Sequence, residues 1–286
     1  MKTRIITSIV GIGVLILVLM AFDTILFNLV ISAISLIAIH EVYAAMGFGK
    51  KEWPLFAVWV PLTLLVMLSM QPSVRRLILP VCYLLLAFVC IYLVVMNGTI
   101  SFQKAAGLVM FSGIILFCFY SLVYLKVLLP ADTYNADAVF FVLLILCFAW
   151  GGDTCAYFTG RAFGKHKLCP VVSPHKTVEG AIGGVIGTMV CGVLATVIYS
   201  FAANRTLAFT RSNIGLSMYA IIALLGVVAA VLGIYGDLFA SVVKRQCGIK
   251  DYGTIFPGHG GIMDRFDSVM FIAPFVTMVI TVVFYR

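Results

Sequence analysis

Charged residues are scarce in this chain. Only 10% of its 286 residues are Asp, Glu, Lys or Arg, whereas 63% are hydrophobic and the mean hydropathy is +1.15. Soluble domains carry about 25% charged and about 45–50% apolar residues, so this composition excludes an ordinary soluble domain. Apolar runs of roughly 18 or more residues recur along the chain, as is typical of membrane-spanning helices. The sequence predicts an all-α, polytopic integral membrane protein.

Cysteine pairs are also missing. The chain has eight cysteines but no CxxC pair, and most of them lie within apolar runs. This pattern argues against a disulfide framework and against a cysteine-based zinc site. The net charge of +8 does not indicate nucleic-acid binding, because the basic residues flank apolar runs, where the positive-inside bias accounts for them.

Polar breaks between the apolar runs predict about nine spans. The first run looks like a secretory signal peptide, but it is long and no small-residue cleavage site follows, so we interpret it as a retained span. We found no internal repeat and no long soluble domain. The predicted spans lie at about residues 5–22, 25–46, 54–70, 77–96, 105–129, 138–158, 178–202, 214–240 and 267–285.

The basic residues predict the orientation. With the N-terminus inside the cell, most of the 19 Lys and Arg residues fall on the cytoplasmic side, as the positive-inside rule expects. This orientation puts the C-terminus outside and two polar loops, 159–177 and 241–266, on the cytoplasmic side, where nucleotides are found. The exceptions are Lys126, near the outer end of a span, with Arg75, Arg76, Arg205, Arg211 and Arg286.

One short stretch holds much of the charge. The chain has 30 charged residues (19 basic and 11 acidic), and seven of them lie between residues 244 and 267. They are Lys244, Arg245, Lys250, Asp251, Asp264, Arg265 and Asp267.

Asp237 precedes this stretch at the end of an apolar run. Asp237, Ser241 and Lys244 stand at i, i+4 and i+7, so they share one face of a helix. An acidic residue within or beside a membrane span is costly and indicates a functional site. The alternative is that Asp237 and Lys244 neutralise each other, although two helical turns separate them.

Asp264 and Asp267 stand at the entry to the last predicted span. Either could cap a helix, since helix starts favour acidic residues. Taken with Asp237, they instead suggest a Mg²⁺ site, because Mg²⁺ takes one or two protein carboxylates together with waters and phosphate oxygens. Basic side chains nearby would then neutralise the phosphates: Lys244, Arg245, Lys250 and Arg265.

The motif "PGHGG" brings three glycines, Gly258, Gly260 and Gly261, around His259. Glycine lets a backbone approach a ligand or adopt positive φ, and successive N–H groups can bind an anion. A tight turn before a helix explains the same motif, so both readings stay open.

The other polar loop carries a second set of candidates. Asp153 and Tyr157 are four residues apart near the end of a span, so Asp153 is another costly acid. "SPHKTVEG" places Lys176 and Glu179 before the seventh span, and a basic edge that contacts lipid headgroups is an alternative for this loop. His40 and Glu41, in the second span, either pair locally or line a cavity.

The segment "SVVKRQCGIKDYGTIFPGHGGIMDRFD", Ser241 to Asp267, resembles the signature of the CTP:phosphatidate cytidylyltransferases, also called CDP-diacylglycerol synthases. Every fixed position of that signature is filled. "DTCAYFTGRAFGKHKL" and "SPHKTVEG" also resemble family segments, so the resemblance covers about residues 150–286. One departure is Ala240, where the family commonly has Glu.

The resemblance divides the chain into variable transmembrane helices, residues 1–149, and a catalytic transmembrane region, residues 150–286. It implies Mg²⁺-dependent transfer from CTP to phosphatidate, giving CDP-diacylglycerol and pyrophosphate, at the cytoplasmic face of a bacterial inner membrane. A second cation is left open, and a homodimer is expected from the resemblance alone. The alternatives are a CTP-dependent lipid kinase of the polyprenol or phytol type, a synthase acting on archaeal ether lipids, and a transporter.

The resemblance also implies residue roles. Asp237 and Asp264 are expected to bind the metal, and Lys244 and Asp267 to complete the catalytic set. The residues expected to bind substrate are Asp153, Tyr157, Arg161, Ser173, Lys176, Glu179, Ser241, Arg245, Lys250, Asp251, His259, Gly260, Gly261 and Arg265.

Overall fold

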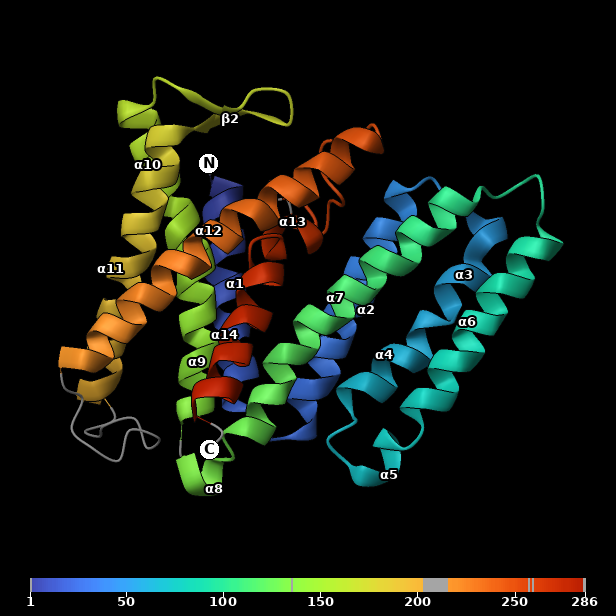
Figure 1. The fold of residues 1–286 in the computed structure, drawn as a ribbon, viewed down its shortest axis with the longest axis horizontal. Coiled ribbons are helices and arrows are strands. Elements are labelled where there is room, and N and C mark those ends of the chain that lie inside the picture. The colour runs from blue at the N-terminus through green and yellow to red at the C-terminus, as the bar shows by residue number, and fades with distance from the viewer. Residues whose placement is uncertain (1, 135, 203–215, 257, 259, 285–286) are drawn as a thin grey trace. The chain divides into compact units, whose positions relative to one another are not determined.

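The computed structural model describes residues 2–134, 136–202, 216–256, 258 and 260–284 (Figure 1). The described chain is almost entirely helical. Its elements are α1 (Lys2–Met20), α2 (Ile25–Ala45), η1 (Lys50–Glu52), α3 (Trp53–Ala57), α4 (Trp59–Met67), α5 (Pro72–Arg75), α6 (Ile78–Val95), α7 (Phe102–Leu128), α8 (Ala131–Tyr134), α9 (Asp137–Leu146), the π-helical turn η2 (Cys147–Gly151), α10 (Gly152–Phe163), β1 (Lys167–Cys169), β2 (Ser173–Thr177), α11 (Val178–Ala202), α12 (Leu216–Gln246), α13 (Met263–Phe266) and α14 (Val269–Phe284).

Six helical segments of the described chain are long and apolar enough to cross a membrane, so the prediction of an all-helical membrane protein is confirmed. Two further predicted spans coincide with shorter apolar helices, and the run 54–70 is split into α3 and α4. Pro61 accounts for this break, because it has no N–H to donate to Ala57 one turn earlier. The count of nine spans stays a prediction. The six segments are Ile25–Ala45, Pro72–Val95, Phe102–Leu128, Asp137–Phe163, Val178–Ala202 and Ser217–Gln246.

The two polar loops are shorter than predicted. Helix α10 continues to Phe163 and the residues from Lys167 to Thr177 form a hairpin, so the expected loop 159–177 is largely ordered secondary structure. Helix α12 likewise runs through Lys244 and Arg245 to Gln246. Gly248, with φ of 70°, adopts the left-handed conformation soon after this helix ends. Arg161 and Lys176 in the first segment and Lys244 and Arg245 in the second therefore lie on helices or strands, whereas Lys250 and Asp251 lie in the loop after α12.

The chain forms two compact units. The first contains Met1–Val123 with Gln246–Arg265, and the second contains Tyr124–Arg245 with Phe266–Arg286. The predicted division at residue 149 separates the chain by expected role and stays a prediction. By packing, most of the charged loop after α12 belongs with the N-terminal helices.

In the first unit, α2 packs against α4, and α4 packs against α6 (Figure 1). Phe27 and Ile39 of α2 are fully buried, as is Met67 of α4. Asn28 is a buried polar residue of α2, and its Nδ2 donates a 2.7 Å hydrogen bond to the carbonyl oxygen of Met67. Helix α4 ends there, so the amide satisfies one of the carbonyls that a helix end leaves without a partner.

In the second unit, α10 and α11 pack closely through small residues, as is common between membrane helices. A Cβ atom added to Gly187 of α11 would lie 2.3 Å from the Cβ of Cys155 in α10. One added to Gly183 would lie 2.1 Å from Oγ1 of Thr159. At contacts this short, a side chain at either position would force the neighbouring helix or side chain to move. The glycines therefore fix the separation of the helices that carry Asp153 and Glu179.

We expect Gly187→Ala to destabilise the protein by about 1–3 kcal/mol, the usual cost of overpacking a close contact. The matched control is Gly113→Ala in α7, where an added Cβ meets nothing within 4 Å. Alanine should be neutral or stabilising there, because it favours helix over glycine. Thermal unfolding of the two variants in detergent checks this, and equal midpoints would contradict the packing account.

Candidate active site

A short hairpin precedes α11 in the second unit. Strands β1 and β2 are antiparallel, with Lys167 opposite Thr177 and Cys169 opposite Ser173. The Oγ1 of Thr177 accepts a hydrogen bond from the backbone N–H of Gly180. This bond caps the first turn of α11 and joins the hairpin to the helix.

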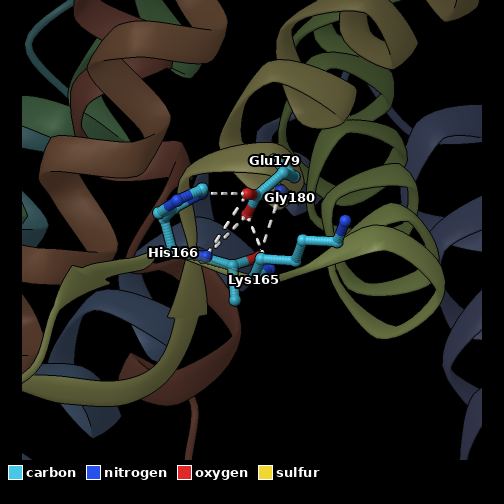
Figure 2. Close-up of polar contacts among 5 residues, drawn as sticks. Lys165, His166, Glu179 and Gly180 are labelled. Carbon is cyan, nitrogen blue, oxygen red and sulfur yellow. Dashed lines mark hydrogen bonds and ion pairs between the residues drawn. The ribbon is translucent and has the colours of Figure 1, made fainter.

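Glu179 ties the segment after α10 to the start of α11. Its carboxylate accepts hydrogen bonds from the backbone N–H groups of Lys165 (3.1 Å) and His166 (3.2 Å). The Nδ1 of His166 lies 2.6 Å from the same carboxylate. Figure 2 shows the His166 ring and the backbone N–H groups directed at this one side chain. Glu179, predicted to bind substrate, thus supports the hairpin in this structure.

Lys176 of the hairpin reaches α12. Its Nζ lies 2.5 Å from Oδ2 of Asp237, and both side chains are about one-quarter exposed. The Ser241 hydroxyl donates to Oδ1 of Asp237 over 3.3 Å, which confirms that these two residues share a helix face. Lys176 is therefore an ion-pair partner of Asp237, a partner that the helix spacing of Asp237 and Lys244 did not indicate. The hairpin and α12 together place an ammonium and a carboxylate side by side.

Three carboxylates of the second unit influence one another. Asp267 is buried and precedes α14, and its Oδ1 accepts the backbone N–H of Ser268. Burial, followed by the charges of Asp237 and Asp153, raises the pKa of Asp267 above the usual carboxyl range. Asp153 in turn accepts a 3.1 Å hydrogen bond from the Ser268 hydroxyl. A cation near these carboxylates would relieve their repulsion.

In the first unit, the backbone of the charged loop folds around Asp264. Its Oδ2 accepts hydrogen bonds from the backbone N–H of Tyr252 (2.8 Å) and of Gly261 (3.0 Å). Asp264 is buried, at 8% exposure, so these donors offset part of the cost of burying the charge. Two bonds from opposite ends of the loop fix the orientation of this carboxylate.

The glycine motif forms a turn. Gly258 and Gly260 have φ angles of 79° and 83°, so both adopt the left-handed conformation, one of the two roles considered for these glycines. The N–H of Phe256 donates to the carbonyl of Gly260, closing the turn. The N–H of Gly261 is already engaged by Asp264, which favours the turn over an anion site at that position. His259, another predicted substrate residue, lies outside the described residues.

The other candidates lie on exposed or partly exposed parts of their units. Lys244 is half-buried near the end of α12, and Arg245 donates from Nε to the Val172 carbonyl over 3.5 Å. The Arg161 guanidinium donates to the Tyr157 hydroxyl along α10, also over 3.5 Å. Ser173 begins β2. Those with exposed side chains are Tyr157, Arg161, Arg245, Lys250, Asp251 and Arg265.

Residues 2–283 match the model of the cytidylyltransferase family. The chain belongs to this family. Several relatives bear the name phosphatidate cytidylyltransferase. That of Staphylococcus haemolyticus is 36% identical over 190 residues, which cover 66% of this chain and 64% of that protein. That of Bacillus subtilis is 32% identical over 237 residues, covering 83% of this chain and 70% of that protein.

A shorter match has higher identity. The Haemophilus influenzae phosphatidate cytidylyltransferase is 41% identical over 144 residues, 50% of this chain and 46% of that protein. The matched segments thus span less than two thirds of the Staphylococcus and Haemophilus proteins. The family resemblance seen in the motifs is confirmed over nearly the whole chain.

Within the described part of this cytidylyltransferase-family chain, no three His, Cys, Asp or Glu side chains lie together as a ready metal centre. Mg²⁺ does not require such a group, since one or two carboxylates suffice when phosphate oxygens and water complete the shell. The second unit brings Lys176, Ser241 and Asp237 together, and the first unit orients Asp264.

Two residues of this region carry contacts that sequence reasoning did not assign. Ser268 binds Asp153, and Glu41 accepts the backbone N–H groups of Ile262 and Met263. Glu41 stood out in the sequence as an acid within an apolar span, the one available signal. Its neighbour His40 instead contacts the Phe56 ring edge-on, at a centroid distance of 5.2 Å.

We expect Glu179→Gln to expose the segment between α10 and β1 to proteolysis. Glutamine retains only one acceptor oxygen for the N–H groups of Lys165 and His166, so local opening should become more frequent. Trypsin cleavage after Lys165 or Lys167 should accelerate about threefold or more, as followed by mass spectrometry. Glu52→Gln, which removes the charge from a similar contact to the Gly49 N–H, is the control and should leave this cleavage unchanged.

We expect Asp267→Asn to preserve or raise the thermal unfolding midpoint. The amide removes a buried negative charge from beside two other carboxylates and keeps an oxygen for the Ser268 N–H. Asp132→Asn, at an exposed position of α8, serves as the control for the loss of one acid. A midpoint clearly below that of the control would show that the Asp267 charge is stabilising.

Proposed function

We propose that this chain transfers the cytidylyl group of CTP to phosphatidate, forming CDP-diacylglycerol and pyrophosphate. The observation that carries the proposal is family membership over residues 2–283, together with relatives that bear the name of this activity. The filled signature from Ser241 to Asp267 supports it. So does the arrangement of acids and bases within each unit, because both substrates are anions.

The proposed reaction does not require a strong general base. A phosphate oxygen of phosphatidate attacks the α-phosphorus of CTP, a new P–O bond forms, and the bond to pyrophosphate breaks. The phosphomonoester is already largely ionised near neutral pH, because its second pKa is about 6. The protein must instead neutralise two anions, align them and stabilise the leaving group.

Basic residues suit the first of these tasks. Lys176 and Lys244 are half-buried, and Arg245 is held near the hairpin by the Val172 carbonyl. We propose that these three side chains contact the phosphates of CTP and phosphatidate. Lysine and arginine differ here, since arginine binds a phosphate with a planar pair of donors and lysine acts as a point charge.

We propose that Mg²⁺ is bound by Asp237 and Asp264. Both present carboxylate oxygens, the ligands that Mg²⁺ prefers, and Asp264 is already oriented by two backbone N–H groups. The ion would supply charge stabilisation to the phosphate oxygens. Asp267 is proposed for the same catalytic set on the family resemblance. Its burial near the charges of Asp237 and Asp153, which a cation would offset, is consistent with that role.

The remaining proposals concern membrane topology, cellular location and oligomeric state. We propose nine membrane crossings, with the N-terminus and the catalytic residues on the cytoplasmic side of a bacterial inner membrane. Exposed apolar side chains on α6, including Leu79, Tyr83 and Val94, support the contact of that helix with lipid. A homodimer is also proposed, supported by the family resemblance alone.

The full-length protein in detergent, given phosphatidate, α-labelled CTP and Mg²⁺, should form labelled CDP-diacylglycerol and release pyrophosphate. Asp237→Asn and Asp264→Asn should each lower the rate by about 100-fold or more, since a catalytic metal contributes several kcal/mol. Asp132→Asn is the control and should retain the wild-type rate.

Two outcomes would contradict the proposal. Release of CDP with an unlabelled lipid product would indicate a kinase, which transfers the γ-phosphoryl group instead. Rates in both aspartate variants equal to the control, with unfolding midpoints unchanged, would remove the assigned metal ligands.

A further inference from the structure

Glu41 is a buried acid of α2 that the cytidylyl-transfer chemistry does not use. It belongs to the first unit, and its side chain is buried, at 4% exposure. Burying a carboxylate is costly unless hydrogen bonds compensate it, so its partners show what the residue is for. Those partners are not neighbours in sequence: they lie 221 and 222 residues further along the chain.

The carboxylate of Glu41 holds two consecutive backbone amides. Oε1 accepts the N–H of Ile262 at 2.9 Å, and Oε2 accepts the N–H of Met263 at 2.8 Å. Both oxygens of the side chain are therefore used on one turn of backbone. The next residue along is Asp264, the proposed metal ligand of this unit. Hydrogen bonds to a charged acceptor are the stronger class, so this contact fixes the turn firmly.

The same carboxylate explains two glycines of the charged loop. A Cβ on Gly261 would lie 2.3 Å from Oε1 of Glu41, and a Cβ on Gly253 would lie 2.4 Å from the same atom. Glu41 therefore occupies the space that side chains at residues 253 and 261 would need. The loop therefore contacts the Glu41 carboxylate on two sides. Glycine is needed at both positions because a side chain of α2 fills the space beside them.

The two acids of this unit share the backbone between them. Gly261 and Tyr252 donate their N–H groups to Asp264, while Ile262 and Met263 donate theirs to Glu41. Each of three successive N–H groups, from residue 261 to 263, is thus bound to one carboxylate or the other. Loss of the Glu41 contact would free the turn that supplies the Gly261 donor to Asp264.

We propose that Glu41 is a positioning residue for cation binding at Asp264: from α2 it holds the 261–263 backbone and so sets the orientation of the Asp264 carboxylate. The proposal rests on the proposed function, in which Asp264 binds Mg²⁺. Glu41 itself contacts neither substrate nor metal. Loss of the Glu41 contact should therefore raise the Mg²⁺ concentration that the protein requires. It should change the reaction rate at saturating Mg²⁺ much less.

The first test uses Glu41→Gln in the full-length protein. The amide keeps the size of the side chain but retains one acceptor oxygen, and its NH₂ group faces one of the two backbone N–H donors. Amide hydrogen exchange, read by mass spectrometry without substrates, should accelerate in peptides covering residues 252–264. Ser35→Ala is the matched control, a buried α2 residue whose hydroxyl donates to the Ile31 carbonyl within its own helix.

The second test measures the response to Mg²⁺ itself. Mg²⁺ added to substrate-free wild-type protein should raise the unfolding midpoint, and Glu41→Gln should need about tenfold more Mg²⁺ for the same effect, given the strength of a charged hydrogen bond. The Mg²⁺ concentration for half-maximal cytidylyl transfer should rise by a similar factor. The rate at saturating Mg²⁺ should stay within about threefold of wild type, a split that a general loss of stability would not produce.

Gly253→Ala provides a second route if Glu41→Gln folds poorly. Its added Cβ displaces the Glu41 carboxylate without removing the charge, and the same shift in Mg²⁺ requirement is expected. Unchanged exchange in residues 252–264, or an unchanged Mg²⁺ requirement beside a lowered midpoint, overturns the proposal. If the wild-type protein forms no CDP-diacylglycerol, the proposed function fails, and the exchange and Mg²⁺-stabilisation measurements still decide the role of Glu41.

Discussion

An acidic side chain that is buried or partly buried in an apolar protein must find hydrogen-bond donors or a counter-charge, and this requirement links elements within each of the two compact units. Asp237 is paired with the ammonium of Lys176, Glu179 with the N–H groups after α10, and Glu41 and Asp264 with loop amides. In each pair, the acid and its partner come from different elements. Neutralising a charge therefore also joins two parts of the chain, and the loops become ordered because the acids need their N–H groups.

Close helix packing makes these pairings possible in the second unit. Gly183 and Gly187 let α10 and α11 approach so closely that an added Cβ would collide with Thr159 or Cys155. The hairpin between these helices is held at both ends, so its position depends on the distance between them. Thr177 caps α11, and Glu179 of α11 accepts the N–H of His166, after α10. Lys176 projects from the same hairpin to Asp237. The close packing at these glycines thus also affects the position of a charged pair.

The sequence predicted the features that composition and short-range spacing determine, namely the helices and the residues that share a helix face. The apolar runs predicted most of the helices to within a few residues, and the i, i+4 spacing correctly placed Ser241 and Asp237 on one helix face. The hairpin at 167–177 was missed because the bonds that join it to its surroundings span many residues: Glu179 of the following helix binds the N–H groups of Lys165 and His166, just before the first strand. The break in the run 54–70 followed from Pro61, whose effect an apolar-run count does not register.

Long-range contacts set the limit of such reasoning. Nothing near Glu41 in the sequence identifies its partners, because they are backbone N–H groups that any residue type would offer. The partner of Asp237 was equally hard to predict. Lys244 has the right charge and lies on the right helix face, but the Nζ of Lys176, from strand β2, lies 2.5 Å from Oδ2 of Asp237. Side-chain chemistry identifies candidate residues for a site. Their partners depend on backbone N–H groups and on which elements pack together, and amino-acid composition indicates neither.

The two proposed metal ligands are held in physically different ways. Asp264 accepts from Tyr252 and Gly261, and backbone N–H groups orient a carboxylate without bringing a full positive charge to it. Asp237 lies against the Lys176 ammonium, which a cation at that carboxylate would have to share or displace. A lysine released from such a pair becomes available to a phosphate oxygen. Neutral donors orient one of these acids and a cationic side chain orients the other, so an added cation would meet a different electrostatic setting at each.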